Sequence, residues 1–289
     1  MQGLTLHVIR IPYSEPITQW LYLSADWHVD APDFDEKMWR DQHDEARQRN
    51  ARCFCFGDLA EYINDTDRKR YNKAADPYQY ENEMFEIRRR LAALLEPYAD
   101  LYDLIGVGNH EVSALRYARD DMVRALLFDL NAKLPEGHRI RHGGYAGFIR
   151  IRFAYTRGST TQSYDIFFDH GQGGEAEVTR GEIDLSRYAM WADADMIVLG
   201  HKHQYKATEL PPLLGLMDRA DVFRYRPRRG VIVSPYKRVP VPAVYDETGY
   251  VRSYQVERKR VPAASRGGVF IRLDLQTTKG PIRSRVELL

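Results

Sequence analysis

The chain has 289 residues, of which 44% are hydrophobic, so it can bury a large core and its composition excludes an intrinsically disordered protein. Its only two cysteines, Cys53 and Cys55, are one residue apart, which excludes a disulfide scaffold. The net charge is +1 and no apolar run reaches the roughly 20 residues of a membrane helix. The first residues lack the features of a signal peptide, so a cytoplasmic protein that does not contact a membrane is expected.

The first half of the chain alternates apolar runs with charged, amphipathic stretches. The apolar runs predict strands and the amphipathic stretches predict helices, the third of which would begin at a Ser113 N-cap. In chain order these are a strand at 20–26, a helix at 34–50, a strand at 52–58, a helix at 80–95, a strand at 101–108 and a helix at 113–130. This alternation favours an α/β core with parallel strands.

The second half has a different pattern, in which strands dominate. It predicts a helix at 184–191 and strands at 148–155, 164–170, 196–199 and 266–275. Alternating apolar and basic residues in the first of these strands indicate antiparallel pairing, in a mixed sheet or in a second sheet. We expect a single domain over residues 1–289, with 206–265 as the candidate for an insertion or a cap.

Five of the predicted strands end in polar residues of the same few types. Ligands of open α/β sheets bind beyond the carboxyl ends of the strands, so these residues are candidates for a site. They are Asp26 and His28, then Asp58, then Asn109 with His110 and Glu111, then His170, and finally His201 and His203. A single motif of this kind would be an ordinary surface or structural feature, but five of the nine histidines stand in these positions.

The spacing of these residues indicates that they converge on metal ions. Side chains two residues apart in an extended segment point to the same side, so Asp26 and His28 could share a target, as could His201 and His203, while Lys202 would point away as a bystander. Carboxylate and imidazole suit Mn²⁺, Fe²⁺, Zn²⁺ or Ni²⁺ and not Ca²⁺. The ligands are too many for one ion, which predicts two divalent ions, with Mn²⁺ preferred, that share a carboxylate.

The ordered blocks D-x-H, G-D, G-N-H-E, H and G-H-x-H resemble the calcineurin-like metallophosphoesterase superfamily, and the later segment from S-P-Y-K-R at 234–238 to R-G-G-V-F-I-R-L at 266–273 resembles the C-terminal part of its phage and bacterial members. The resemblance of the ordered blocks runs from Asp26 to His203. It implies a four-layer α-β-β-α sandwich, in which two packed mixed β-sheets are flanked by helices. It also implies a first metal bound by Asp26, His28 and His203, a second bound by Asn109, His170 and His201, a bridging Asp58, and a catalytic His110 that contacts the phosphoryl oxygens or the leaving group.

The second block differs from the protein Ser/Thr phosphatase branch of that superfamily. That branch carries G-D-x-V-D-R-G, whereas this chain has G-D-L-A-E-Y-I at 57–63 and lacks the arginine. Glu61 takes the position of the aspartate that orients the catalytic histidine in that branch, so we expect Glu61 to support His110. Glu111 is expected either to hydrogen-bond a metal-binding histidine or to cap the helix that follows.

The resemblance implies hydrolysis of phosphate esters by in-line attack of a metal-bridging hydroxide, with His110 as the proton donor. Residues 201–289 carry 18 Lys and Arg against 8 Asp and Glu, which favours a nucleic acid or nucleotide substrate and hence a phosphodiesterase or nuclease. The alternatives are a phosphomonoesterase or protein phosphatase, a basic region that is only solvated surface, and a non-catalytic scaffold of the same fold.

Overall fold

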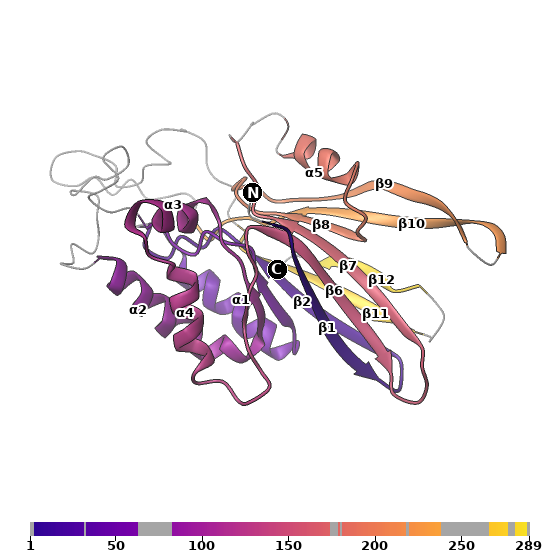
Figure 1. Cartoon of the computed structure of the whole chain (residues 1–289), viewed down its shortest axis with the longest axis horizontal. Coiled ribbons are helices and arrows are strands. Elements are labelled where there is room, and N and C mark those ends of the chain that lie inside the picture. Colours follow the sequence, from indigo (N-terminus) through magenta and orange to yellow (C-terminus); the bar gives the residue numbers. More distant parts are fainter. Residues whose placement is uncertain are drawn as a thin grey trace.

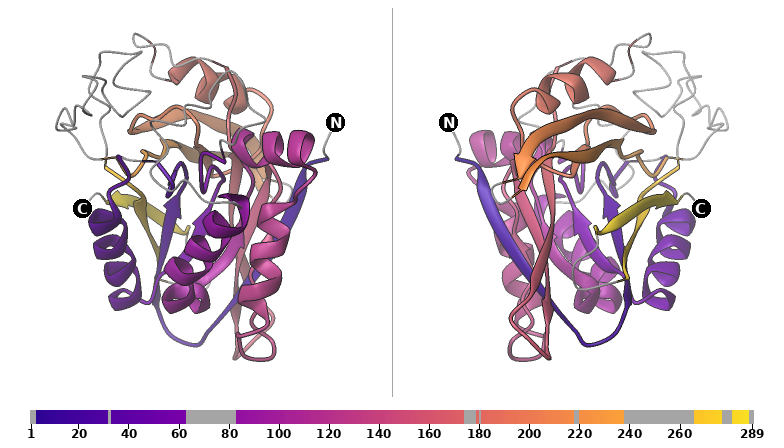
Figure 2. Two further views of the ribbon diagram at one scale, coloured as in Figure 1. Left: turned by 90° about the vertical axis from the view of Figure 1, so that its left-hand side faces the viewer. Right: turned by 90° about the vertical axis from the view of Figure 1, so that its right-hand side faces the viewer.

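The computed structural model describes residues 3–31, 33–62, 83–173, 179, 181–217, 220–237, 266–276 and 281–287. Within these residues the chain forms two six-stranded mixed β-sheets and five α-helices. The sheets lie face to face in the middle of the molecule, with helices on their outer sides (Figures 1 and 2). The prediction of an α/β fold with two mixed sheets is therefore confirmed.

One sheet, which we call sheet B, holds most strands of the first half of the chain together with the last two described strands. Its order is β12 (Arg283–Glu287), β11 (Val269–Leu275), β2 (Ile17–Ser24), β3 (Arg52–Cys55), β4 (Tyr102–Ile105) and β5 (Arg141–His142). The last four are parallel, whereas β11 pairs in the antiparallel direction with β2, and β12 pairs in the antiparallel direction with β11. Parallel pairing brings the carboxyl ends of β2, β3 and β4 to the same edge of the sheet.

The other sheet, sheet A, holds most strands of the second half. Its order is β1 (Thr5–Tyr13), β6 (Ala146–Tyr155), β7 (Thr161–Asp169), β8 (Met196–Leu199), β10 (Ala220–Ile232) and β9 (Lys206–Met217). β7, β8 and β10 are parallel, whereas β6 and β9 pair in the antiparallel direction with β7 and β10. The carboxyl ends of β7 and β8 therefore also lie together.

The strand sequences explain why the two sheets stack. Side chains alternate between the faces of a strand, so β3 directs Phe54 towards sheet A and Cys53 and Cys55 towards the helices. Phe54 packs in the core between the sheets with residues such as Ile166 and Phe168. The two cysteines are free and buried, and they pack as small apolar residues in the core between sheet B and its helices.

Helices cover the outer faces of both sheets. α1 (Glu36–Gln48), α2 (Glu83–Leu95) and α4 (Met122–Asn131) contribute to the core cluster on sheet B, together with the 3₁₀-helix Glu96–Leu101. On sheet A, Leu185 of α5 (Glu182–Ala189) packs against Phe167 and Ile197. The layers are thus helix, sheet, sheet and helix, as Figure 2 shows. No helix in the described residues is long and apolar enough to cross a membrane.

The structure corrects the predicted helix at 113–130. Two helices stand there, α3 (Asn109–Ala118) and α4, and the first begins at Asn109 with Gly108 as its N-cap, so the predicted Ser113 N-cap is wrong. The break follows from Arg119, whose left-handed backbone (φ 56°) ends α3, and from Asp121, which accepts a hydrogen bond from the Arg124 N–H and starts α4. Asn109 and His110 therefore lie in the first turn of a helix.

Two further parts of sheet A differ from the expected pattern. Strand β1 was not anticipated, because its apolar residues alternate only weakly and its partner β6 lies far along the chain. The described part of 206–265 contains β9 and β10, which pair with each other and extend sheet A as a long two-stranded ribbon (Figure 1). Residues 218–219 and 238–265 of this candidate cap lie outside the described residues.

Candidate metal centre

The five polar strand ends predicted from the sequence meet at one place between the sheets. The Asp26 N–H, after β2, donates to the Gly57 carbonyl, after β3, at 2.9 Å. His170, which follows β7 of sheet A, forms a hydrogen bond between the two sheets. Its Nδ1–H donates to the carbonyl of Phe56, which follows β3 of sheet B, at 2.9 Å. Because Nδ1 carries this proton, Nε2 of His170 is the nitrogen that faces the cluster.

The backbone at these loops is unusual. Asp26, His28, Asp58, His201 and His203 all have positive φ, between 48° and 64°, and they are five of the eight described non-glycine residues with this conformation. The left-handed conformation costs an L-residue roughly 1–2 kcal/mol and persists only where the surroundings enforce it, commonly at functional sites. The expectation that these segments are extended is therefore wrong, and His201 and His203 do not share a target, whereas Asp26 and His28 do, as expected.

One group of side chains consists of Asp26, His28 and His203. One ligand atom from each lies within 4.8 Å of the others, and all three residues are buried. Nε2 of His28 is 3.1 Å from Nε2 of His203, and the latter is 3.6 Å from Oδ1 of Asp26. The structure thus brings together the three residues predicted to bind the first metal.

A second group consists of Asp58, His170 and His201, again with ligand atoms within 4.8 Å of one another. Nε2 of His170 is 3.1 Å from Oδ2 of Asp58 and 3.1 Å from Oδ1 of Asn109. Nε2 of His201 donates to the Gly173 carbonyl at 2.9 Å, and its buried Nδ1 has no hydrogen-bond partner in the described part of the chain. These are the residues predicted for the second metal, together with the predicted bridging residue.

His110 and Glu61 lie beside both groups. Nδ1 of His110 is 2.7 Å from the backbone carbonyl of Glu61 and 3.6 Å from its Oε2. Since a carbonyl only accepts, Nδ1 carries a proton, and Nε2 of His110 lies on the side of Asp58, 3.8 Å from Oδ2. Glu61 therefore contacts His110 as expected, but the shorter contact comes from its backbone. Its carboxylate also lies 3.3 Å from Nδ1 of His28.

Of the two roles expected for Glu111, the structure shows the helix cap. Its carboxylate accepts hydrogen bonds from the N–H groups of Asp58 (2.9 Å), Leu59 (2.7 Å) and Gly108 (2.7 Å). It therefore caps α3 and joins the loops after β3 and β4, and within the described residues its carboxylate accepts from these backbone N–H groups and not from a histidine. Burial and the charge of Asp58 raise the pKa of Glu111 to about 7.

Electrostatics favour a bound cation at this centre. Burial lowers the pKa of His28 to about 3, and burial with the nearby His170 lowers the pKa of His201, so both rings are neutral at pH 7 and offer a lone pair. For His170, burial is outweighed by Asp58 and by further carboxylates, which raise its pKa to about 10. Carboxylates that stabilise a proton so strongly would stabilise a divalent cation for the same reason.

The donor set therefore fits a pair of divalent ions. Nitrogen lone pairs and carboxylate oxygens converge in two adjacent buried groups, and the unpartnered Nδ1 of His201 would cost free energy without a ligand. Close packing keeps the groups in place, since a Cβ at Gly108 would lie 2.1 Å from Oδ1 of Asp58 and one at Gly57 would lie 2.3 Å from the Gly108 nitrogen.

Sequence reasoning missed the role of Lys237. It is one of the basic residues counted at 201–289, in the sequence Tyr-Lys-Arg at 236–238, but its side chain is only 3% exposed, and Tyr236 is fully buried. Nζ of Lys237 is 3.8 Å from Oδ2 of Asp33 and 3.9 Å from Oε1 of Glu61, beside the first group. No local signal marks it, because a lysine in a charged run reads as surface. Trp27, between Asp26 and His28, is fully buried and packs edge-on against Trp39, so it belongs to the core.

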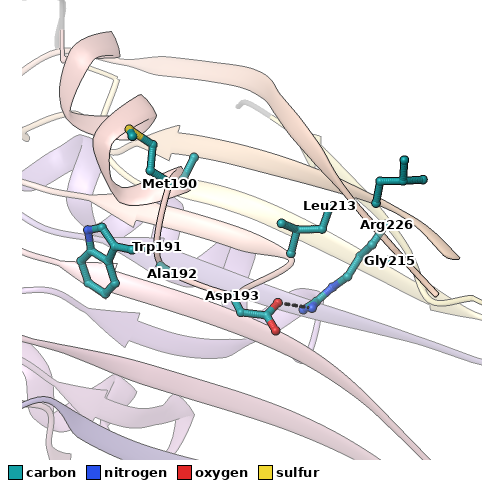
Figure 3. A pocket seen from close by; sticks show the side chains of 9 residues that line it. Met190, Trp191, Ala192, Asp193, Leu213, Gly215 and Arg226 are labelled. Carbon is teal, nitrogen blue, oxygen red and sulfur yellow. Dashed lines mark hydrogen bonds and ion pairs between the residues drawn. The ribbon is translucent and has the colours of Figure 1, made fainter. Parts of the chain in front are cut away.

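The basic run at 224–229 also proves less exposed than its composition suggests. Arg226 is paired with Asp193 and Asp195, and Arg228 is 2% exposed and donates to three backbone carbonyls. Figure 3 shows Arg226 and Asp193 at a surface hollow of about 400 Å³ between the end of α5 and the β9–β10 ribbon. This hollow is lined by none of the candidate metal ligands. The run at 258–260 lies outside the described residues.

Comparisons with known proteins add no family to these observations. No model of a known protein family matches the chain, and no curated protein matches it at a significant level.

Proposed function

We propose that this chain is a dinuclear-metal phosphoesterase with the site architecture of the calcineurin-like metallophosphoesterases. The observation that carries the proposal is the convergence of ligands from four strand ends into two adjacent, largely buried groups, each with a carboxylate and two imidazoles, with Asn109 from the fifth strand end 3.1 Å from His170. Two such groups, built on left-handed backbone, are hard to explain as structural polar residues. A scaffold without catalysis would need neither this convergence nor His110 beside it.

In this proposal Asp26, His28 and His203 hold one ion, and Asn109, His170 and His201 hold the other. Asp58 would bridge them, since its carboxylate lies within the second group and its backbone N–H is fixed by Glu111. When bound, two divalent ions would lower the pKa of a coordinated water and neutralise charge on phosphoryl oxygens. Mn²⁺ is the first choice, and Fe²⁺, Zn²⁺ and Ni²⁺ suit the same donors.

His110 is the proposed proton donor to the leaving oxygen. Its Nδ1–H is engaged by the Glu61 carbonyl at 2.7 Å, which fixes the ring and turns Nε2 towards Asp58. A proton held at Nε2 would therefore stand beside the place where the phosphoryl group must bind. General acid catalysis of this kind contributes about 10²–10⁴-fold to a rate.

The proposed substrate class is phosphate esters, without preference between diesters and monoesters. The argument for a nuclease depended on the basic residues after His201. In the described part of that region, Arg226 and Arg228 are bound to the protein and Lys237 is buried, so these three residues give a nucleic acid little to contact.

Asp58→Asn tests the proposal. Full-length protein loaded with Mn²⁺ should bind about two ions per chain and hydrolyse p-nitrophenyl phosphate or bis-p-nitrophenyl phosphate. The variant should lose more than about 100-fold in activity and about one ion, because an amide is a poorer bridging ligand than a carboxylate. Metal content would be counted by mass spectrometry.

Asp165→Asn is the matched control, because it makes the same change in β7, where the carboxylate pairs with Arg150. It should keep both ions and full activity. Wild-type protein with fewer than one ion per chain at neutral pH would contradict the proposal, whatever the activity.

A further inference from the structure

Lys202 lies between the two histidines of the loop after β8, and its environment was not foreseen. The side chain does point away from the metal groups, as expected, but it is not a bystander in solvent. Only 4% of the residue is exposed, Nζ donates to the Gln172 carbonyl at 2.7 Å, and Nζ lies 2.8 Å from Oδ2 of Asp184. A buried ammonium group is retained only where such partners compensate its lost hydration.

These contacts connect three elements of the candidate metal centre. Gln172 follows His170 in the loop after β7, and Asp184 lies in the first turn of α5. The aliphatic part of Lys202 lies under the start of that helix, since a Cβ at Gly181 would be 3.4 Å from its Cγ. Next to it, Nε2 of His201 donates to the Gly173 carbonyl. The loops that carry His170, His201 and His203 are thus fastened to each other and to α5.

The strain in this loop explains why it needs such an anchor. His201 and His203 have φ of 64° and 49°, each of which costs about 1 kcal/mol or more unless the surroundings hold it. The His201 N–H is held from one side, by both oxygens of Asp26 at 3.1 and 2.9 Å. Lys202 holds the same loop through the Gln172 carbonyl and Asp184.

We propose that Lys202, through Asp184 and the Gln172 carbonyl, is a positioning residue that holds His201 and His203 in the geometry needed to bind the two metal ions. This inference rests on the proposed function, because it assumes that those histidines are ligands. Lys202 itself touches neither ions nor substrate. Residues that orient metal ligands typically change metal affinity by 10–100-fold when they are replaced.

The test is metal binding, measured without any substrate. Metal-free full-length protein would be titrated with Mn²⁺ against a chromophoric chelator. Lys202→Met keeps the length of the buried stem and removes the ammonium group, and it should weaken Mn²⁺ binding by about 10–100-fold. Lys202→Arg, which can still reach Asp184, should restore part of the loss. Asp184→Asn, which leaves Lys202 in place, should give a smaller loss in the same direction.

Lys206→Met is the matched control. Lys206 pairs with Glu182 on the same helix, at a more exposed position, and in the described part of the chain no hydrogen bond or ion pair joins its side chain to the histidine loop. It should bind Mn²⁺ as the wild type does. Urea unfolding of the metal-free proteins shows whether each variant is folded, and if Lys202→Met is not, Asp184→Asn decides.

The outcomes separate the two proposals. Wild-type protein that binds no metal would overturn the proposed function and this inference with it. Wild-type protein that binds two ions, with Lys202→Met and Asp184→Asn binding equally well, would overturn only the inference. An equal loss in Lys206→Met would also overturn it, because the effect would then come from α5 in general.

Discussion

His201 and His203 are separated by one residue, yet their side chains enter different groups. In an ideal strand they would share a side, and one metal would be the natural target of both. The left-handed backbone at each position redirects them, so that His203 meets His28 and Asp26 while His201 lies beside His170 and Asp58. The sequence shows that two histidines stand here, but it does not show the backbone angles that direct them to different groups. Those angles depend on contacts with distant loops.

The close packing around Gly108 predicts that a single added methyl group would disturb the candidate metal centre. Gly108→Ala would place a methyl group 2.1 Å from Oδ1 of Asp58 and 2.5 Å from Cε1 of His170. Both side chains are buried, so they must move, and we expect a destabilisation of about 1–3 kcal/mol. Mn²⁺ binding, measured by chelator competition, should weaken by at least about 10-fold.

The same substitution at Gly215 is the control, because a Cβ there would meet nothing within 4 Å. Gly215→Ala should change the unfolding free energy by no more than about 0.5 kcal/mol and leave Mn²⁺ binding unchanged. Normal metal binding by Gly108→Ala would show that Asp58 and His170 tolerate displacement, which would weaken their assignment as ligands.

At the scale of elements, the end of α5 shows how a basic residue can be structural. The Arg228 guanidinium, in β10, donates to the carbonyls of Ala189 (2.8 Å), Ala192 (2.6 Å) and Ala194 (2.9 Å). The Ala189 carbonyl stands at the end of α5, where carbonyls lack partners within the helix, and the other two lie in the segment that follows, so Arg228 fixes the end of α5 and this segment to sheet A. A count of charges along the sequence cannot distinguish such an arginine from one that binds a polyanion.

Replacement of Arg228 should therefore cost stability. Arg228→Met leaves three carbonyls with fewer donors in a buried place, and we expect the unfolding free energy in urea to fall by about 3 kcal/mol. Arg157→Met is the comparison, since Arg157 pairs with Glu15 on an exposed surface and such pairs contribute less than about 1 kcal/mol. Equal effects from the two changes would contradict the assigned role of Arg228.

At the scale of the whole molecule, the sequence predicted those features that depend on local pattern. Apolar runs followed by Asp, His or Asn marked the five strand ends, and the structure brings those ends together. Features that depend on distant partners were missed, such as β1, which pairs with β6, and the burial of Lys237. The split between α3 and α4 was missed because Arg119, a good helix former, takes a left-handed conformation.

The stability of the whole fold should depend on pH through His43, which is not one of the candidate metal ligands. His43 is fully buried on α1, stacks on Trp39 with ring centroids 3.5 Å apart, and its ring nitrogens contact the Trp39 carbonyl and the Tyr102 hydroxyl, each at 2.6 Å. Burial lowers its pKa to about 3, and the charge of Arg40 acts in the same direction. The ring is therefore neutral in the folded protein, with its proton on the nitrogen that faces the carbonyl.

The sign of the pH effect follows from this shift. Above about pH 6.5 the ring is neutral in both states, and His43 adds no pH dependence. Between about pH 6.5 and 3 only the unfolded chain takes up the proton, so stability falls as the pH falls, with a limiting slope of about 1.4 kcal/mol per pH unit from this residue. His43→Gln should be less stable than the wild type at pH 7.5, yet its unfolding free energy in urea should decline less steeply between pH 6 and 4. If the unfolding free energies of the two metal-free proteins fell in parallel over this pH range, His43 would not be the source of the pH dependence. The carboxylates that titrate in the same range are present in both proteins, so their effect cancels in the comparison.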